Sequence, residues 1–265
     1  MPLKAEMVAV DPDCLLVFLD ETGHERMPRG HTYYGIGGCA TLMRDYERTV
    51  LLPWYGFRQL VRGNPLAQLH AADFGRDASP EQLEALGTFF RSNAFMRIGS
   101  AGAVTTEMPA DKSYREHLTA VQDAEHLAWM VLRGLQKRIL AVANWTVFQS
   151  VALIFERNPR SRRLLLSAFG DLGPEENGRR LPVELHEMPK SAGEPGLEVA
   201  DFIANTIAGH ARSHLVERRS GFRKDFQAVF QSVDVKLASF MAITSVGYTP
   251  ALNPGSGNQP SEVSV

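Results

Sequence analysis

The fold prediction rests on a stretch near the start of the chain, where residues 15–23 have the sequence LLVFLDETG. The apolar run Leu15–Leu19 contains no polar position, which is typical of a strand buried on both faces of a sheet. Asp20 follows this run directly, and Glu21–Gly23 has the composition of a turn. A carboxylate at the end of a buried strand is costly unless it is paired or bound to a cation. Asp20 is therefore the first candidate site residue.

Beyond this strand, strand-like and helix-like stretches follow each other in an irregular order. Apolar patterning predicts further strands at Tyr33–Met43, Phe95–Thr106, Val147–Phe155 and Pro182–Met188. Apolar residues at helical spacing predict helices at Asp45–Arg62, Pro80–Ser92, Tyr114–Val142, Gly196–Leu215 and Phe222–Ile243. This order predicts an α/β fold with a mixed sheet and helices packed on it.

Local residues refine these boundaries. Ser79 is placed to cap a helix that begins at Pro80, since proline is favoured in a first helical turn. Pro53 is expected to interrupt the helix over residues 45–62 early. Glycines within the second strand predict a close approach of another backbone or a bulge. They are Gly35, Gly37 and Gly38.

The bulk composition is that of a globular chain, with 265 residues, 44% of them hydrophobic and 22% charged. We expect one domain over residues 1–249 and a disordered tail over residues 250–265, which are rich in Pro, Gly, Ser and Asn. No apolar run of about 18 residues occurs, and residues 1–13 lack the layout of a signal peptide. These features predict a cytoplasmic protein without a membrane segment, in which Cys14 and Cys39 are buried thiols.

Two further acids repeat the setting of Asp20. Glu156 follows the apolar run Val147–Phe155, and Asp201 lies between apolar neighbours in a predicted helix. Acids that end neighbouring strands of an α/β sheet meet in one crevice, where they repel each other unless a cation lies between them. Oxygen ligands favour Mg²⁺ or Mn²⁺. The alternative is that each acid only forms a turn or caps a helix.

The formal net charge of −2 does not indicate a nucleic-acid binder, but the arginines are clustered. The clusters are Arg157, Arg160, Arg162 and Arg163, and Arg212, Arg218, Arg219, Arg223 and Lys224. Such clusters are usually solvated faces, and the alternative is contact with phosphates. Arg157 directly follows Glu156, and Arg212 lies beyond Asp201, so these two are expected to flank the site.

Four short segments carry a family resemblance: residues 18–23 (FLDETG), 69–71 (LHA), 154–157 (IFER) and 197–204 (LEVADFIA). Their residue types and order resemble the motifs of domain-of-unknown-function family 3800, which is found widely in bacteria and phages. Together they span most of the chain. This family is grouped with ribonuclease H-like folds, so the resemblance implies a ribonuclease H-like mixed sheet.

The resemblance also implies a metal-dependent phosphodiesterase-type site. The first hypothesis for function is therefore a nuclease-like enzyme whose substrate is DNA, RNA or a nucleotide. The resemblance makes Asp20, Glu156 and Asp201 candidate ligands of Mg²⁺ or Mn²⁺, with Glu156 alternatively a general base for water. Glu21 either assists or caps the turn. His70 either orients water or contacts phosphate, and its alternative is a hydrogen-bonded structural histidine.

Two positions depart from the family pattern. Glu156 stands where Asp is usual, which lengthens the reach of the carboxylate, and Glu198 stands where Gln is usual, which adds a negative charge beside Asp201. Either change tunes the site or marks a chain without catalysis. The second hypothesis for function is therefore a catalytically inactive ribonuclease H-like binding scaffold in a mobile-element or phage-defence system.

Two other enzyme classes fit the sequence less well. Residues 20–23 faintly resemble the Asp-x-Thr-Gly of aspartyl-phosphate enzymes, but no matching acidic motif with glycine follows a later strand. No Gly-x-x-x-x-Gly-Lys-Ser/Thr sequence occurs, which argues against a P-loop nucleotide hydrolase.

Overall fold

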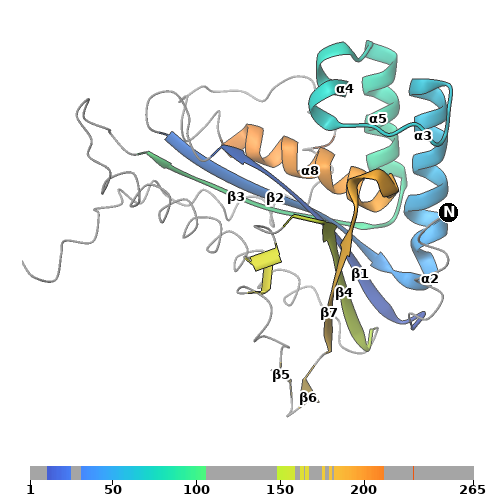
Figure 1. Ribbon diagram of the computed structural model, residues 1–265. Helices are drawn as coiled ribbons and strands as arrows, with labels where there is room; N and C mark the ends of the chain where they lie inside the picture. The colour runs from blue at the N-terminus through green and yellow to red at the C-terminus, as the bar shows by residue number, and fades with distance from the viewer. Residues whose placement is uncertain are drawn as a thin grey trace, which may run out of the picture.

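The computed structural model describes residues 11–24, 31–105, 148–158, 162–163, 165–166, 175–176, 179–180, 182–211 and 229 (Figure 1). Several predictions fall outside these residues. They are the helix at Tyr114–Val142, nearly all of the helix at Phe222–Ile243, Arg212 with the basic cluster beyond it, and the tail from Pro250.

A five-stranded sheet forms the centre of the described fold. Its strands are β1 (Cys14–His24), β2 (His31–Leu42), β3 (Met96–Thr105), β4 (Ser150–Glu156) and β7 (Val183–Met188), in the spatial order β3-β2-β1-β4-β7. β1, β2 and β3 pair antiparallel, whereas β4 is parallel to β1 and β7 is parallel to β4. A separate two-stranded ribbon consists of β5 (Glu175–Glu176) and β6 (Arg179–Arg180). The predicted α/β class, a mixed sheet with helices packed on it, is confirmed.

The first strand is longer than its sequence indicates. The run Leu15–Leu19 is buried as predicted, with every residue at most 4% exposed. Glu21–Gly23 was predicted to turn, and this is wrong, because β1 continues to His24. β2 pairs with β1 along this whole length, from Leu15 opposite Leu42 to His24 opposite Tyr33. The ladder hydrogen bonds override the local turn preference.

Helix α8 (Pro195–Ala211) lies across one face of the sheet, against β1, β2 and β3 (Figure 1). The predicted close approach at the glycines of β2 is confirmed here. A Cβ atom on Gly37 would lie 2.1 Å from the backbone nitrogen of Ala204, and one on Gly35 would lie 2.7 Å from the Cβ atom of Ala208. Small residues on both elements therefore let the helix pack directly on the sheet, which fixes the position of Asp201.

The remaining helices gather beside α8 at one end of the molecule (Figure 1). They are α2 (Met43–Tyr46), the π-helical turn η2 (Glu47–Leu51), α3 (Leu52–Arg62), α4 (Ala71–Asp77), α5 (Pro80–Ser92) and the short 3-10 turn η3 (Lys190–Ala192). Pro53 lies in the first turn of α3. The regular α-helical hydrogen bonding of the predicted helix is interrupted just before it by the π-helical turn η2, as expected. The Ser79 cap is confirmed as a capping box with Gln82. Helix α4 was not predicted.

The core between α8, the sheet and this helical end is aromatic. Trp54 of α3 packs against Phe57, Phe89 and Phe202 at ring-centroid distances of 4.9, 4.8 and 5.4 Å. Cys14 and Cys39 are buried free thiols, as predicted. Within the described part of the chain, none of the helices is sufficiently long and apolar to cross a membrane.

Candidate functional site

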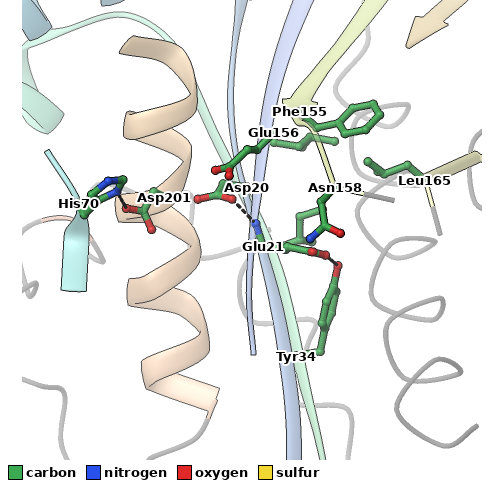
Figure 2. Close-up of a pocket in the computed structure, with 11 residues that line it drawn as sticks. Asp20, Glu21, Tyr34, His70, Phe155, Glu156, Asn158, Leu165 and Asp201 are labelled. Atoms are coloured by element: carbon green, nitrogen blue, oxygen red, sulfur yellow. Dashed lines mark hydrogen bonds and ion pairs between the residues drawn. The ribbon is translucent and has the colours of Figure 1, made fainter. Parts of the chain in front are cut away.

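The sheet places two acids toward the carboxyl ends of its parallel strands β1 and β4. β1 and β4 run parallel, with Leu19 opposite Phe155, so Asp20 and Glu156 follow neighbouring positions of the two strands. β4 ends at Glu156 while β1 continues, which opens a notch beside β1. Asp201 reaches the same notch from α8 (Figure 2). Carboxyl ends of parallel strands are the usual place for ligand sites in α/β sheets.

A pocket of about 280 Å³ fills this notch. Its described lining consists of Leu19, Asp20, Glu21, Tyr34, Ile36, His70, Phe155, Glu156, Asn158, Leu165 and Asp201. All five candidate residues from the sequence, Asp20, Glu21, His70, Glu156 and Asp201, are thus brought together from four separate segments (Figure 2).

Asp20 is strongly perturbed by its surroundings in this pocket. Burial raises the pKa of Asp20 well above its ordinary value, and the neighbouring carboxylates of Asp201, Glu156 and Glu21 raise it further. The backbone N–H of Glu21 donates to Asp20 Oδ1 at 2.8 Å, which opposes the rise in pKa. The described lining of the pocket contains no lysine or arginine to balance these charges.

His70 and Asp201 form the opposite wall. Asp201 Oδ2 accepts the backbone N–H of Ala71 at 2.9 Å, and the same oxygen lies 3.9 Å from Nδ1 of His70. His70 is the basic side chain in the described lining, and 40% of its side chain is exposed. A histidine at this place can exchange a proton with a group in the pocket.

The pocket also contains side chains that the sequence did not indicate. Tyr34, from β2, donates its hydroxyl to Glu21 Oε2 at 2.5 Å. Burial, and then Glu21, raise the pKa of Tyr34 well above its ordinary value, so the phenol stays protonated and holds Glu21 in place. Phe155 and Leu165 add an apolar side to the pocket (Figure 2). Only the strand register brings Tyr34 to Glu21, and a periodic pattern in sequence carries no such signal.

The donor set fits a hard divalent cation. Carboxylate oxygens from three elements face one pocket, and their mutual repulsion is the electrostatic condition that a bound cation relieves. Among the described residues, no three His, Cys, Asp or Glu side chains already form a group of the kind that holds a metal ion. The fit is therefore one of donor chemistry and charge.

Arg157, which directly follows Glu156, and Arg162 both pair with Glu187. Arg157 Nε lies 3.9 Å from Glu187 Oε2, and Arg162 Nε lies 3.3 Å from Glu187 Oε1. About two thirds of each arginine side chain is nevertheless exposed. Exposed ion pairs contribute little free energy, so a phosphate can compete for these guanidinium groups.

Glu198 does not add charge to the pocket in the way expected from its place beside Asp201. It is buried and pairs with the equally buried Arg58, whose Nη2 lies 2.7 Å from Glu198 Oε1. The departure from Gln at this position is therefore balanced within the protein, and that expectation is corrected.

Glu194 is a second buried acid that sequence reasoning missed. Burial raises its pKa to about 8, and the Tyr46 hydroxyl donates to its Oε1. Glu194 and Glu198 line a small cavity of about 30 Å³ that also touches Asp20, Glu156 and Asp201. Protonation keeps this acid neutral at neutral pH.

No family model matches the chain, and no curated protein matches it. Among solved structures, the chain is similar to "LC9-RNase H1, a type 1 RNase H with the type 2 active-site motif", at 13% identity over 87% of this chain and 85% of that chain, with a TM-score of 0.32. A similarity at this level carries no argument about the site, and the strand order and directions are what define the architecture.

Proposed function

We propose that this protein is a metal-dependent phosphodiesterase of the nuclease type, with its active site in the acidic pocket beside β1, where β4 ends. The observation that carries the proposal is Asp20, a desolvated carboxylate within β1 that is crowded by Asp201, Glu156 and Glu21. Repulsion in a cluster of this kind destabilises the metal-free protein, and a bound cation relieves that repulsion.

In this proposal Asp20, Glu156 and Asp201 hold Mg²⁺ or Mn²⁺. A bound ion of this type polarises a phosphodiester and lowers the pKa of water. The protein supplies orientation, because the N–H of Glu21 fixes Asp20 and the N–H of Ala71 fixes Asp201. His70, at the partly exposed side of the pocket, is placed to exchange a proton with solvent. The Tyr34 hydroxyl holds the Glu21 carboxylate on the wall opposite His70.

The family resemblance supports the same site. The four segments that resemble domain-of-unknown-function family 3800 contribute Asp20, His70, Glu156 and Asp201, and these four residues line one pocket. Residues that are distant in sequence and meet in space are expected of an active site built on a rigid sheet. We therefore also propose membership of that family.

Nucleic acid is the proposed substrate class. The acidic pocket would take the scissile phosphodiester together with the ion, and exposed Arg157 and Arg162 would contact neighbouring phosphates. An inactive scaffold would keep the fold without metal-dependent cleavage.

The test is cleavage of labelled single-stranded and duplex DNA and RNA with Mg²⁺, Mn²⁺ or Ca²⁺, alongside calorimetric titration with Mn²⁺. We expect Mn²⁺ binding and Mg²⁺- or Mn²⁺-dependent cleavage in the wild type. Asp20→Asn should reduce cleavage at least a hundredfold and weaken Mn²⁺ binding at least tenfold.

The matched control is Glu84→Gln, an exposed acid on α5 that pairs with Arg91 far from the pocket lining. It should bind Mn²⁺ and cleave like the wild type. A wild-type protein that binds no Mn²⁺ and cleaves none of these substrates would overturn the proposal and favour the scaffold.

A further inference from the structure

The buried ion pair behind the acidic pocket has more partners than charge balance requires. Arg58 and Glu198 are 1% and 7% exposed. Glu198 Oε2 accepts from Trp54 Nε1 at 2.7 Å and from Arg58 Nε at 3.0 Å, and Glu198 also accepts the backbone N–H of Leu69. The carboxylate therefore joins helix α8, helix α3 and the segment that leads to His70.

The segment around His70 is held on both sides by α8. His70 is extended, with φ −117° and ψ 133°, so the N–H groups of Leu69 and Ala71 point to the same side. Leu69 donates to Glu198 and Ala71 donates to Asp201, and these two acids lie three residues apart on one face of the helix. The residue between the two donors is His70, which lines the pocket (Figure 2).

Arg58 secures the same region from α3. Its guanidinium donates to the carbonyl oxygen of Pro65 at 3.3 Å and to that of Gly193 at 2.6 Å. Pro65 precedes His70 in the connection between α3 and α4, and Gly193 lies just before α8. One buried side chain thus ties together the segments that carry His70 and Asp201.

We propose that Arg58 and Glu198 are positioning residues, which hold the Leu69–Ala71 segment and α8 in register so that His70 and Asp201 stay side by side on one wall of the acidic pocket. This inference rests on the proposed function of that pocket. A buried ion pair adds little net stability compared with well-packed apolar residues. The network instead restricts the geometry of two groups that face the ligand.

The first test measures amide hydrogen exchange by NMR in the metal-free protein. In Glu198→Gln, the amide has a single oxygen to accept the hydrogen bonds that the two carboxylate oxygens share in the wild type. We expect exchange at Leu69 and at Ala71 to accelerate at least tenfold, although Ala71 donates to Asp201 and not to Glu198. Val17, in the buried part of β1, reports global unfolding, so the acceleration at Leu69 and Ala71 is measured relative to any change at Val17.

The second test uses the double variant Arg58→Met with Glu198→Met, which removes both charges while filling the space. We expect its melting temperature to exceed that of Glu198→Gln, while fast exchange at Ala71 persists and Mn²⁺ affinity falls at least tenfold. If Glu198→Gln does not fold, this variant decides the question. Arg91→Gln, which breaks the exposed pair with Glu84, is the control and should leave Ala71 unchanged.

The positioning role would be overturned if Ala71 exchanged at the wild-type rate in the double variant, or if Glu198→Gln accelerated exchange at Leu69 alone. Exchange is read without metal or substrate, so this result is separate from the proposed activity. Absence of Mn²⁺ binding and cleavage in the wild type overturns the proposed function alone.

Discussion

Helix α8 carries two carboxylates three residues apart that lie in contrasting surroundings. Glu198 faces Arg58 and Trp54 in a buried network that supplies a full positive charge. Asp201 faces Asp20 and Glu156, in a pocket whose described lining has no lysine or arginine. Both acids are held by backbone N–H groups of the same segment, from Leu69 and Ala71. Their local anchoring is alike, and their charge balance differs.

A third acid shows another solution to burial. Glu194 lies between the two regions, and it avoids charge because its pKa is raised to about 8. The protein therefore balances one buried acid with arginine, keeps another protonated, and leaves the group around Asp20 crowded. The crowded group is the one with room for an external cation. Burial of an acid alone does not mark a functional site, whereas unbalanced burial beside a pocket does.

The largest stability effect is expected at the buried ion pair of Arg58 and Glu198. Arg58→Met leaves Glu198 buried without its cation, so the free energy of unfolding should fall by about 3–5 kcal/mol. Urea unfolding followed by circular dichroism measures this change. A loss below about 1 kcal/mol would show that the network does not depend on its charge.

The protonated acid predicts a pH dependence. The pKa of Glu194 is about 8 in the folded protein and 4.5 ordinarily, so the folded state binds more protons between these values. Its stabilising contribution is full below pH 4.5 and is lost as the pH rises through 8, by up to about 1.4 kcal/mol per pH unit. Glu194→Gln should therefore flatten the fall in unfolding free energy between pH 5 and 8. Parallel curves for the variant and the wild type would contradict this.

Within the acidic pocket, Glu21 is held by a neutral phenol, whereas Glu198 is held by the cationic Arg58. Tyr34→Phe removes the hydroxyl that donates to Glu21, and a hydrogen bond to a charged group contributes about 1.5 kcal/mol or more. We expect a loss of that order in unfolding free energy. The control is Tyr55→Phe on half-buried Tyr55 of α3, which should change it by less than about 0.5 kcal/mol.

The smallest effect, and one of opposite sign, is expected at the crowded acid. Asp20→Asn keeps an oxygen for the N–H of Glu21 and removes one repelling charge, so the unfolding free energy without metal should stay unchanged or rise by about 1 kcal/mol. Paired thermal melts in EDTA and in Mn²⁺ measure this. A variant that is destabilised without metal, or that gains as much from Mn²⁺ as the wild type, would remove the distinction between the two sides of α8.

Much of the architecture is predictable from periodicity. The buried run Leu15–Leu19, the helix Pro80–Ser92 with its Ser79 cap, and the small residues of β2 are local signals whose physical meaning depends little on the rest of the chain. The short helix α4 was missed because its seven residues give too little periodic pattern. The turn predicted at Glu21–Gly23 was wrong because β2 is available as a pairing partner along the whole of β1.

From the amino-acid sequence alone came the strand elements of the mixed sheet and five candidate site residues, since each follows an apolar stretch or matches a short motif. Tertiary structure decided which acids share a pocket and which have a partner. Tyr34 meets Glu21 through strand register, and Arg58 meets Glu198 across 140 residues of sequence. The pKa of a buried acid depends on the charges and donors within a few ångströms, and in this protein folding brings those groups together from distant parts of the chain.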